Sequence, residues 1–174
     1  MTNAEIAHGQ KREIFKMIKV GLGCDIHKLI RGRRFLLGGV ELPFNKGEDG
    51  HSDGDVLAHA VCDALLGAAG LGDIGELFPP SDPSYKDADS MELLRIAASR
   101  VKQSGWKIIN IDSVIILEKP KVLPYRDVIR KSLAEALEIP FECVFVKGKT
   151  AEGLGPAGKG KAVEAHVVCL LGNE

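Results

Sequence analysis

The chain has 174 residues, which is enough for one domain, and 45% of them are hydrophobic, so it can bury a sizeable core. The net charge of −1 gives no bulk argument for binding nucleic acid or an anionic membrane, because such binding needs clustered Lys and Arg side chains. The longest apolar run, residues 163–171, includes Glu164 and His166 and is too short to span a bilayer.

The first sixteen residues carry no apolar signal-peptide core, and their acidic side chains argue against a transit peptide. We therefore expect residues 1–16 to be a poorly ordered extension of a domain over residues 17–174. Alternating, β-branched residues then predict a strand over residues 17–27 that ends near Asp25. A strand interrupted by two glycines is expected next, over residues 33–43. A glycine-rich loop is expected to follow it over residues 44–54.

A helix is expected over about residues 55–69, where Asp53 or Asp55 provides the N-cap. Its apolar face is expected to be core and carries Val56, Ala60, Val61, Ala64, Leu65 and Ala68. Prolines exclude regular structure from residues 70–86. The remaining pattern predicts helices near residues 90–104 and 124–137, strands over residues 108–118, 143–150 and 161–171, and a glycine-rich loop over residues 151–160. No repeat or linker divides the chain, so it reads as one α+β domain.

The side chains of Asp25 and His27 are predicted to leave the first strand on the same side, because residues two apart in a strand share a face. A carboxylate with an imidazole suits zinc, although a strand-end Asp and a surface His would look the same. On the following helix, Asp55, His59 and Asp63 form one polar stripe, in which an acid could orient the His59 ring; ordinary surface polarity is the alternative. Together, Asp25, His27 and His59 would supply three ligands and leave a fourth position open, as in catalytic zinc sites.

The cysteines are scattered along the chain and form no CxxC pair, which argues against a thiolate zinc site and against a disulfide scaffold. Any metal is therefore expected to use His and carboxylate ligands. A reducing, cytoplasmic location is the simplest interpretation of Cys24, Cys62, Cys143 and Cys169.

Two loops carry side chains that suit phosphate groups. His51 and Ser52 lie in the first glycine-rich loop and could donate to an anionic oxygen, although His51 could equally have no role. In the later loop, Thr150 could donate to a phosphoryl oxygen and Glu152 could hold Mg²⁺, although a solvated basic hairpin is the alternative. Lysines surround this loop at positions 147, 149, 159 and 161, but the order of residues is not that of a Walker loop. Residues 117–123 give a weaker signal for a pocket that holds a flat base.

Five segments coincide with one known family: "GLGCDIHKL", "LLGGVELP", "GHSDGDVLAHAVCDALLGAAGLGDIGELFPPSDP", "EKPKVLPY" and "KTAEGLG". On these segments the chain resembles the 2-C-methyl-D-erythritol 2,4-cyclodiphosphate synthases, from about Ile18 to Leu171. The resemblance implies a phosphorus–oxygen lyase of the non-mevalonate isoprenoid pathway, with a mixed β-sheet, helices packed on one face, and a homotrimer with active sites at the subunit interfaces. The substrate would be 4-diphosphocytidyl-2-C-methyl-D-erythritol 2-phosphate, and the products the cyclic diphosphate and CMP.

The resemblance also implies roles for individual residues. Asp25, His27 and His59 correspond to zinc ligands, and Glu152 corresponds to the ligand of Mg²⁺ (or Mn²⁺). His51 and Thr150 correspond to the residues that stabilise the transition state, and His51 with Ser52 to the pair that contacts the diphosphate. The methylerythritol part would lie against Asp63, Asp73, Ile74 and Gly75. A further loop that contacts the substrate would consist of Phe78, Pro79, Pro80, Ser81 and Asp82. The cytidine pocket would use Leu117, Pro120, Lys121, Val122, Leu123, Gly148, Lys149 and Thr150.

Three residues depart from the pattern of the family. Lys149 stands where many members have Thr, in the nucleotide pocket. Pro156 and Lys159 stand where a Phe and an Arg are often found, and these line an axial cavity for an isoprenoid diphosphate in some members. The sequence therefore gives no support for that accessory binding, although Lys159 remains a candidate substrate contact. Two other functions compete with the synthase: a zinc-dependent hydrolase of nucleotide diphosphates, and a non-catalytic trimeric module that binds a ligand.

Overall fold

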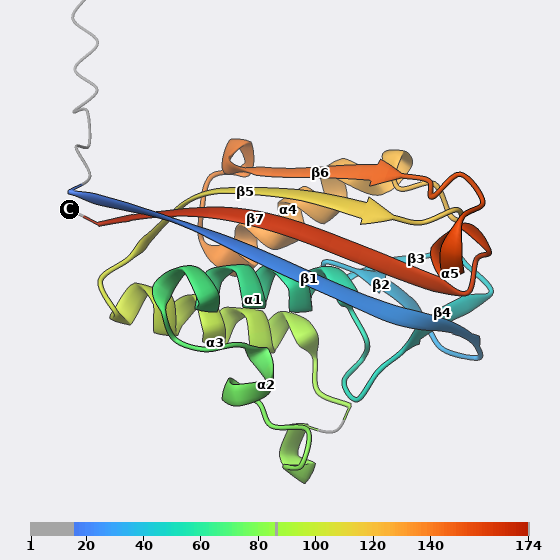
Figure 1. Cartoon of the computed structure of the whole chain (residues 1–174), viewed down its shortest axis with the longest axis horizontal. Coiled ribbons are helices and arrows are strands. Elements are labelled where there is room, and N and C mark those ends of the chain that lie inside the picture. Colours follow the sequence, from blue (N-terminus) through green and yellow to red (C-terminus); the bar gives the residue numbers. More distant parts are fainter. Residues whose placement is uncertain (1–15, 86, 174) are drawn as a thin grey trace, which may run out of the picture.

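A five-stranded mixed sheet forms one layer of the protein, and helices form the other (Figure 1). The computed structural model describes residues 16–85 and 87–173. The strands in spatial order are β4 (Lys46–Asp49), β1 (Met17–Arg31), β7 (Ala162–Asn173), β5 (Lys107–Ile116) and β6 (Val144–Lys149). Neighbours are antiparallel except for β5 and β6, which are parallel, so the predicted mixed sheet is confirmed.

The helices α1 (Val56–Ala69), α3 (Ser90–Gln103) and α4 (Arg126–Leu137) enclose the hydrophobic core with one face of this sheet. Along β7, Val163, Ala165 and Val167 are fully buried, whereas the residues between them face outward. This alternation is the period-2 pattern of a sheet that is covered on one face only. The other face keeps large apolar side chains exposed, including Ile18, Val20, Leu22, Ile26 and Val168.

Helix α1 approaches β1 so closely that two positions of the strand must be glycine. A Cβ atom on Gly21 would lie 1.9 Å from the Ala64 carbonyl oxygen, and one on Gly23 would lie 1.9 Å from the Ala60 carbonyl oxygen. Real Cβ atoms do not approach oxygen at that distance. The pattern "GLG" therefore sets the helix–sheet spacing, and this spacing brings His59 of α1 next to the residues that follow in β1.

The predicted elements are largely confirmed, including the core face of α1 and its N-cap, which is Asp55. The bounds or types of some predicted strands and loops were wrong. Strand β1 continues to Arg31, because it pairs with β4, which lies inside the predicted loop 44–54. The predicted strand 33–43 is a small hairpin of β2 (Phe35–Leu37) and β3 (Val40–Leu42), because Gly38 and Gly39 have φ of +57° and +76°.

The two loops expected without regular structure contain short helical turns. These are α2 (Ile74–Leu77), η1 (Pro83–Tyr85) and α5 (Gly155–Gly158), and 3₁₀ turns η2 (Leu123–Tyr125) and η3 (Phe141–Cys143) flank α4. The expected N-terminal extension, residues 1–16, lies outside the described residues except for Lys16, so this expectation stays untested. Over residues 16–85 and 87–173, no helix is long and apolar enough to cross a bilayer.

Candidate metal centre and adjoining pockets

Asp25, His27 and His59 meet at the contact between β1 and α1. The Asp25 Oδ2 atom lies 3.1 Å from His27 Nε2 and 3.1 Å from His59 Nδ1. The two imidazole rings meet edge to face, with their centroids 5.1 Å apart. Sequence reasoning predicted that these three side chains come together, and the structure confirms this.

The arrangement fits a tetrahedral metal ion. Bond lengths of about 2.0–2.2 Å to N and O ligands place neighbouring ligand atoms about 3.4 Å apart around such an ion. The ligand atoms of the three residues lie within 4.8 Å of one another. Among residues 16–85 and 87–173, this is the one group of at least three His, Cys, Asp or Glu residues with that property. Three ligands leave a fourth position for an incoming oxygen atom.

Hydrogen bonds to the second nitrogen of each ring leave the first one free to face a metal. His27 Nδ1 lies 2.6 Å from the Gly54 carbonyl oxygen and 3.1 Å from Glu48 Oε2. His59 Nε2 lies 2.9 Å from Ser90 Oγ, which donates to Asp53 Oδ1 at 2.5 Å. Such partners fix the orientation of metal-binding imidazoles.

The prediction that Asp55 or Asp63 orients His59 was wrong. Asp55 is fully buried, and its carboxylate accepts from the backbone N–H groups of Gly38 and Gly39 in addition to capping α1. The Asp63 carboxylate accepts from the Ile74 N–H at 2.8 Å. The spacing of four residues on the helix therefore placed Asp55 and Asp63 near His59. Backbone N–H groups, however, occupy both carboxylates.

In the metal-free protein, burial and hydrogen bonds shift the pKa values of Asp25 and His27. Burial favours the neutral form of Asp25, but hydrogen bonds from His27 and His59 outweigh it and hold the pKa of that carboxyl well below its usual range. Burial also opposes a charged His27, yet hydrogen bonds to Asp25 and Glu48 raise the pKa of this imidazole to about 10. A metal ion entering the group must therefore displace a proton from His27.

Glu48, on β4, is the residue of this centre that sequence reasoning missed. Its side chain is fully buried, and its Oε2 atom accepts from the Val56 N–H at 2.8 Å as well as facing His27. The Oε1 atom is buried with no hydrogen-bond partner among the described residues. A single acid inside a glycine-rich segment gave no signal, because its role depends on β4 pairing beside β1.

A pocket of about 210 Å³ opens beside the metal centre. It is lined by His27, His51, Ser52, His59, Ile74, Gly75, Phe78, Pro80, Tyr85 and Leu93. Most of the predicted diphosphate and methylerythritol contacts thus lie around one cavity, and Tyr85 and Leu93 are additions. Asp73 caps α2 through the Glu76 N–H, and Asp82 accepts from the Ser84 N–H, so these two carboxylates also hold the backbone of this region.

A second pocket, of about 320 Å³, lies at the end of β6. It is lined by Leu117, Lys121, Val122, Leu123, Arg126, Val146, Lys147, Gly148, Lys149 and Thr150. Seven of these residues were predicted for a nucleotide pocket, and Arg126, Val146 and Lys147 are additions. Pro120, predicted with them, follows a cis peptide bond in the segment that leads into η2.

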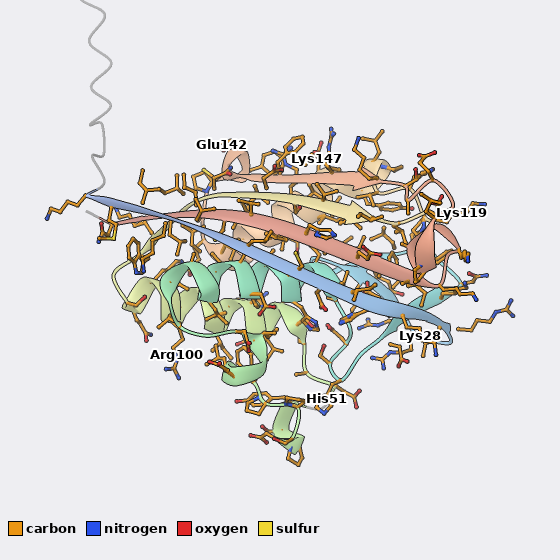
Figure 2. The ribbon with its side chains drawn as sticks, in the orientation of Figure 1. Lys28, His51, Arg100, Lys119, Glu142 and Lys147 are labelled. Carbon is orange, nitrogen blue, oxygen red and sulfur yellow. The ribbon has the colours of Figure 1, made fainter. Side chains whose placement is uncertain are left out.

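The two pockets share no lining residue. In Figure 2, Lys147 of the second pocket and His51 of the first stand on opposite sides of the molecule. Thr150 donates to the exposed carboxylate of Glu152 at the mouth of the second pocket, and Lys159 ends α5. Within one chain, Glu152 is therefore not part of the Asp25–His27–His59 group.

The sequence model of the YgbB family matches residues 18–172. The chain belongs to the YgbB family. A curated member, the 2-C-methyl-D-erythritol 2,4-cyclodiphosphate synthase of Treponema denticola, is 58% identical over 154 residues, which are 88% of this chain and 96% of that protein.

Solved structures of YgbB-family proteins have the same fold as this chain. A 2C-methyl-D-erythritol-2,4-cyclodiphosphate synthase in its CDP-bound form is 39% identical, with a TM-score of 0.81 over 88% of this chain and 99% of that one. The bifunctional IspDF of Campylobacter jejuni is also 39% identical, with a TM-score of 0.88 over 91% of this chain. This chain spans 43% of that longer protein.

Proposed function

We propose that this chain converts 4-diphosphocytidyl-2-C-methyl-D-erythritol 2-phosphate into 2-C-methyl-D-erythritol 2,4-cyclodiphosphate and CMP, as a lyase of the non-mevalonate isoprenoid pathway. The observation that carries the proposal is the Asp25–His27–His59 group beside a pocket, in a chain that is 58% identical to a named synthase. In this reaction the 2-phosphate oxygen attacks the β-phosphorus of the same molecule and CMP leaves. The nucleophile is already tethered, so no protein nucleophile is needed.

We assign Zn²⁺ to Asp25, His27 and His59, and Mg²⁺ (or Mn²⁺) to Glu152. An Asp–His–His set with ligand atoms this close suits zinc, whereas a single exposed carboxylate suits a hydrated hard cation that is completed by substrate phosphates. When bound, these cations would neutralise the phosphate groups that must approach each other.

The protein's own donors hold the phosphates in place. The exposed His51 and the buried Ser52 Oγ lie on one pocket with both histidine ligands, where they can donate to diphosphate oxygens. Thr150 at the other pocket can donate to an oxygen beside the departing CMP. These donors are positioned before the reaction, so they favour the charge that develops during it.

The second pocket suits a pyrimidine nucleotide. Leu117, Val122 and Val146 are buried and give the pocket an apolar wall, and Lys121 and Lys149 add positive charge for the phosphate. The CDP bound to a solved relative supports this assignment. The contacts with the methylerythritol part fall to Asp63, Asp73, Ile74 and Gly75, and residues 78–82 provide a further loop that contacts the substrate.

We further propose a homotrimer in which neighbouring copies complete each active site. Within one chain, the second pocket, where Thr150 contacts Glu152, shares no residue with the pocket beside the metal group, and Lys147 and His51 stand on opposite sides of the molecule, which favours a site that an associated copy completes. The open sheet face, with Ile18, Val20, Leu22, Ile26 and Val168 exposed, is an apolar surface of the kind that oligomers bury. Four free cysteines fit the reducing cytoplasm as the place of action.

The reaction is tested by following phosphorus NMR of the diphosphocytidyl substrate with the purified protein, with and without a chelator. A cyclic diphosphate with CMP, lost on chelation and restored by Zn²⁺ with Mg²⁺, supports the proposal. A linear product that contains oxygen from solvent water would instead indicate a hydrolase. A folded His59→Ala variant should retain its oligomeric state and lose the zinc held by the Asp25–His27–His59 group and nearly all turnover; normal turnover would remove the metal group from the mechanism.

A further inference from the structure

Cys24 and His166 form a close pair on the open face of the sheet, away from the metal centre. They are cross-strand partners in β1 and β7, and Cys24 Sγ lies 3.3 Å from His166 Nδ1. The other ring nitrogen of His166 lies 3.7 Å from Glu164 Oε2. The three side chains border a cavity of about 260 Å³ whose other lining residues are Asp25 and Ile26.

We propose that Cys24 and His166 form a second metal site, which binds a soft divalent ion such as Zn²⁺ through a thiolate and an imidazole. Bond lengths of about 2.3 Å to sulfur and 2.0–2.1 Å to nitrogen place the two ligand atoms about 3.6 Å apart around a tetrahedral ion. The observed 3.3 Å is close to that separation. The thiolate ligand selects zinc-like ions over Mg²⁺ or Ca²⁺.

The Glu164 carboxylate lies 3.7 Å from His166 Nε2, which is longer than a hydrogen bond but close enough for its charge to act on the ring. It lies on the Nε2 side of the ring, so it favours a proton on that nitrogen and leaves the lone pair of Nδ1 facing Cys24. One thiolate and one carboxylate also balance the two positive charges of the ion, so the occupied site adds no net charge to an apolar face.

Neighbouring charges on this face do not compete for the pair. Lys147 and Asp112, on β6 and β5, are paired with each other at 2.6 Å. Asp25 is adjacent to Cys24 in the chain, but strand alternation sends its side chain to the inner face, where it contacts His27 and His59. The site therefore has its own ligands, and further positions are open to water or to donors of another copy.

The proposal does not depend on the proposed reaction, because it uses contacts within one chain on the other face of the sheet. Sequence spacing could not reveal it: the two residues are 142 positions apart and meet only through the pairing of β1 with β7.

The test is a titration of the chelated, reduced full-length protein with Co²⁺, followed by absorption. Asp25, His27 and His59 contain no sulfur, so a near-ultraviolet thiolate-to-cobalt band reports on the second site alone. We expect the band in the wild-type protein and in His59→Ala, and its loss in Cys24→Ser. His166→Ala should weaken the Co²⁺ affinity that the band reports by about tenfold or more.

Cys143→Ser is the matched control, since Cys143 is a partly exposed cysteine away from this pair, and it should keep the band. Zinc content should fall in Cys24→Ser by one ion per chain, or by a fraction of one if copies share an ion. Retained binding at the first centre will establish that this variant is folded. A wild-type protein with no thiolate band, or a band that survives in Cys24→Ser, would overturn the proposal.

Discussion

Replacing Glu48 tests how the buried carboxylate behind His27 contributes to metal binding. Its Oε2 atom contacts His27 Nδ1 at 3.1 Å, and the side chain is fully buried. In Glu48→Leu, an apolar side chain of similar size takes its place, and His27 keeps only the Gly54 carbonyl oxygen at 2.6 Å. Burial raises the pKa of Glu48 to about 8, and in Glu48→Gln the amide oxygen can still accept from His27 while the side chain can no longer ionise.

The expected loss follows from these contacts. Removing an outer partner of a metal-binding His lowers metal affinity about 10- to 100-fold. Each factor of ten is about 1.4 kcal/mol, so Glu48→Leu should cost about 1.4–2.8 kcal/mol of zinc binding free energy. Glu48→Gln keeps one acceptor, and the loss should therefore be smaller than for Leu.

Zinc affinity can be measured by competition with a chromophoric chelator, and the tautomer of His27 by ¹⁵N NMR of the metal-free protein above a pH of about 10, where this ring is neutral. The reasoning requires that Glu48→Leu lowers affinity and reduces the population with a proton on Nδ1, while Gln retains that tautomer. Should Glu48→Leu bind zinc within twofold of wild type with an unchanged tautomer, the Gly54 carbonyl alone orients the ring and the argument fails.

Three further predictions concern pH, packing and magnesium. The pKa of His27 is raised from 6.5 to about 10, so its contribution to the stability of the chelated protein is complete below pH 6.5 and is lost as pH rises through about 10. Denaturant unfolding should show this decline, zinc affinity should rise over the same window, and His27→Gln should flatten both profiles. Gly23→Ala should destabilise the fold by about 1–3 kcal/mol, because its Cβ would meet the Ala60 carbonyl, and should weaken zinc binding. The control is Gly67→Ala, at an exposed position of α1 where no atom lies within 4 Å of the added Cβ. Its free energy of unfolding should rise by about 0.5–1 kcal/mol. Equal thermal stability of the two variants would contradict the packing argument. Glu152→Gln should lower turnover at limiting Mg²⁺ and be partly rescued by high Mg²⁺, and an unaltered rate at limiting Mg²⁺ would count against its role.

Local patterns predicted most of the fold. The apolar stripe of α1, its cap at Asp55, the alternation of β1 and the presence of strand β7 are all set by neighbouring residues, and they are confirmed. Strand β4 was missed because it is four residues long and contains a glycine and two acids, so only its pairing with the end of β1 makes it a strand. For the same reason the sequence placed the end of β1 too early.

In the candidate site, too, some residues could be predicted from local patterns and others could not. Asp25 and His27 could be put on one side of a strand from spacing alone, and His59 on the polar side of a helix. Their meeting was an inference from chemistry, and it is confirmed by the structure. Glu48 and Ser90, which contact the rings from other elements, gave no local signal, because tertiary contacts bring them there. The same limit explains why a capping acid, Asp55, was mistaken for a partner of His59.

The alternation of β1 also has a consequence for how the chain reaches its native pairing. Asp25 and His27 face α1, and Cys24 and Ile26 face the open side, so sliding β1 by one residue against β7 would exchange the two sets. A misaligned strand would direct a thiol and an isoleucine at His59, and zinc would lose two of its three inner ligands. A divalent ion present during folding would thus stabilise the native alignment of β1 with β7 over the shifted one.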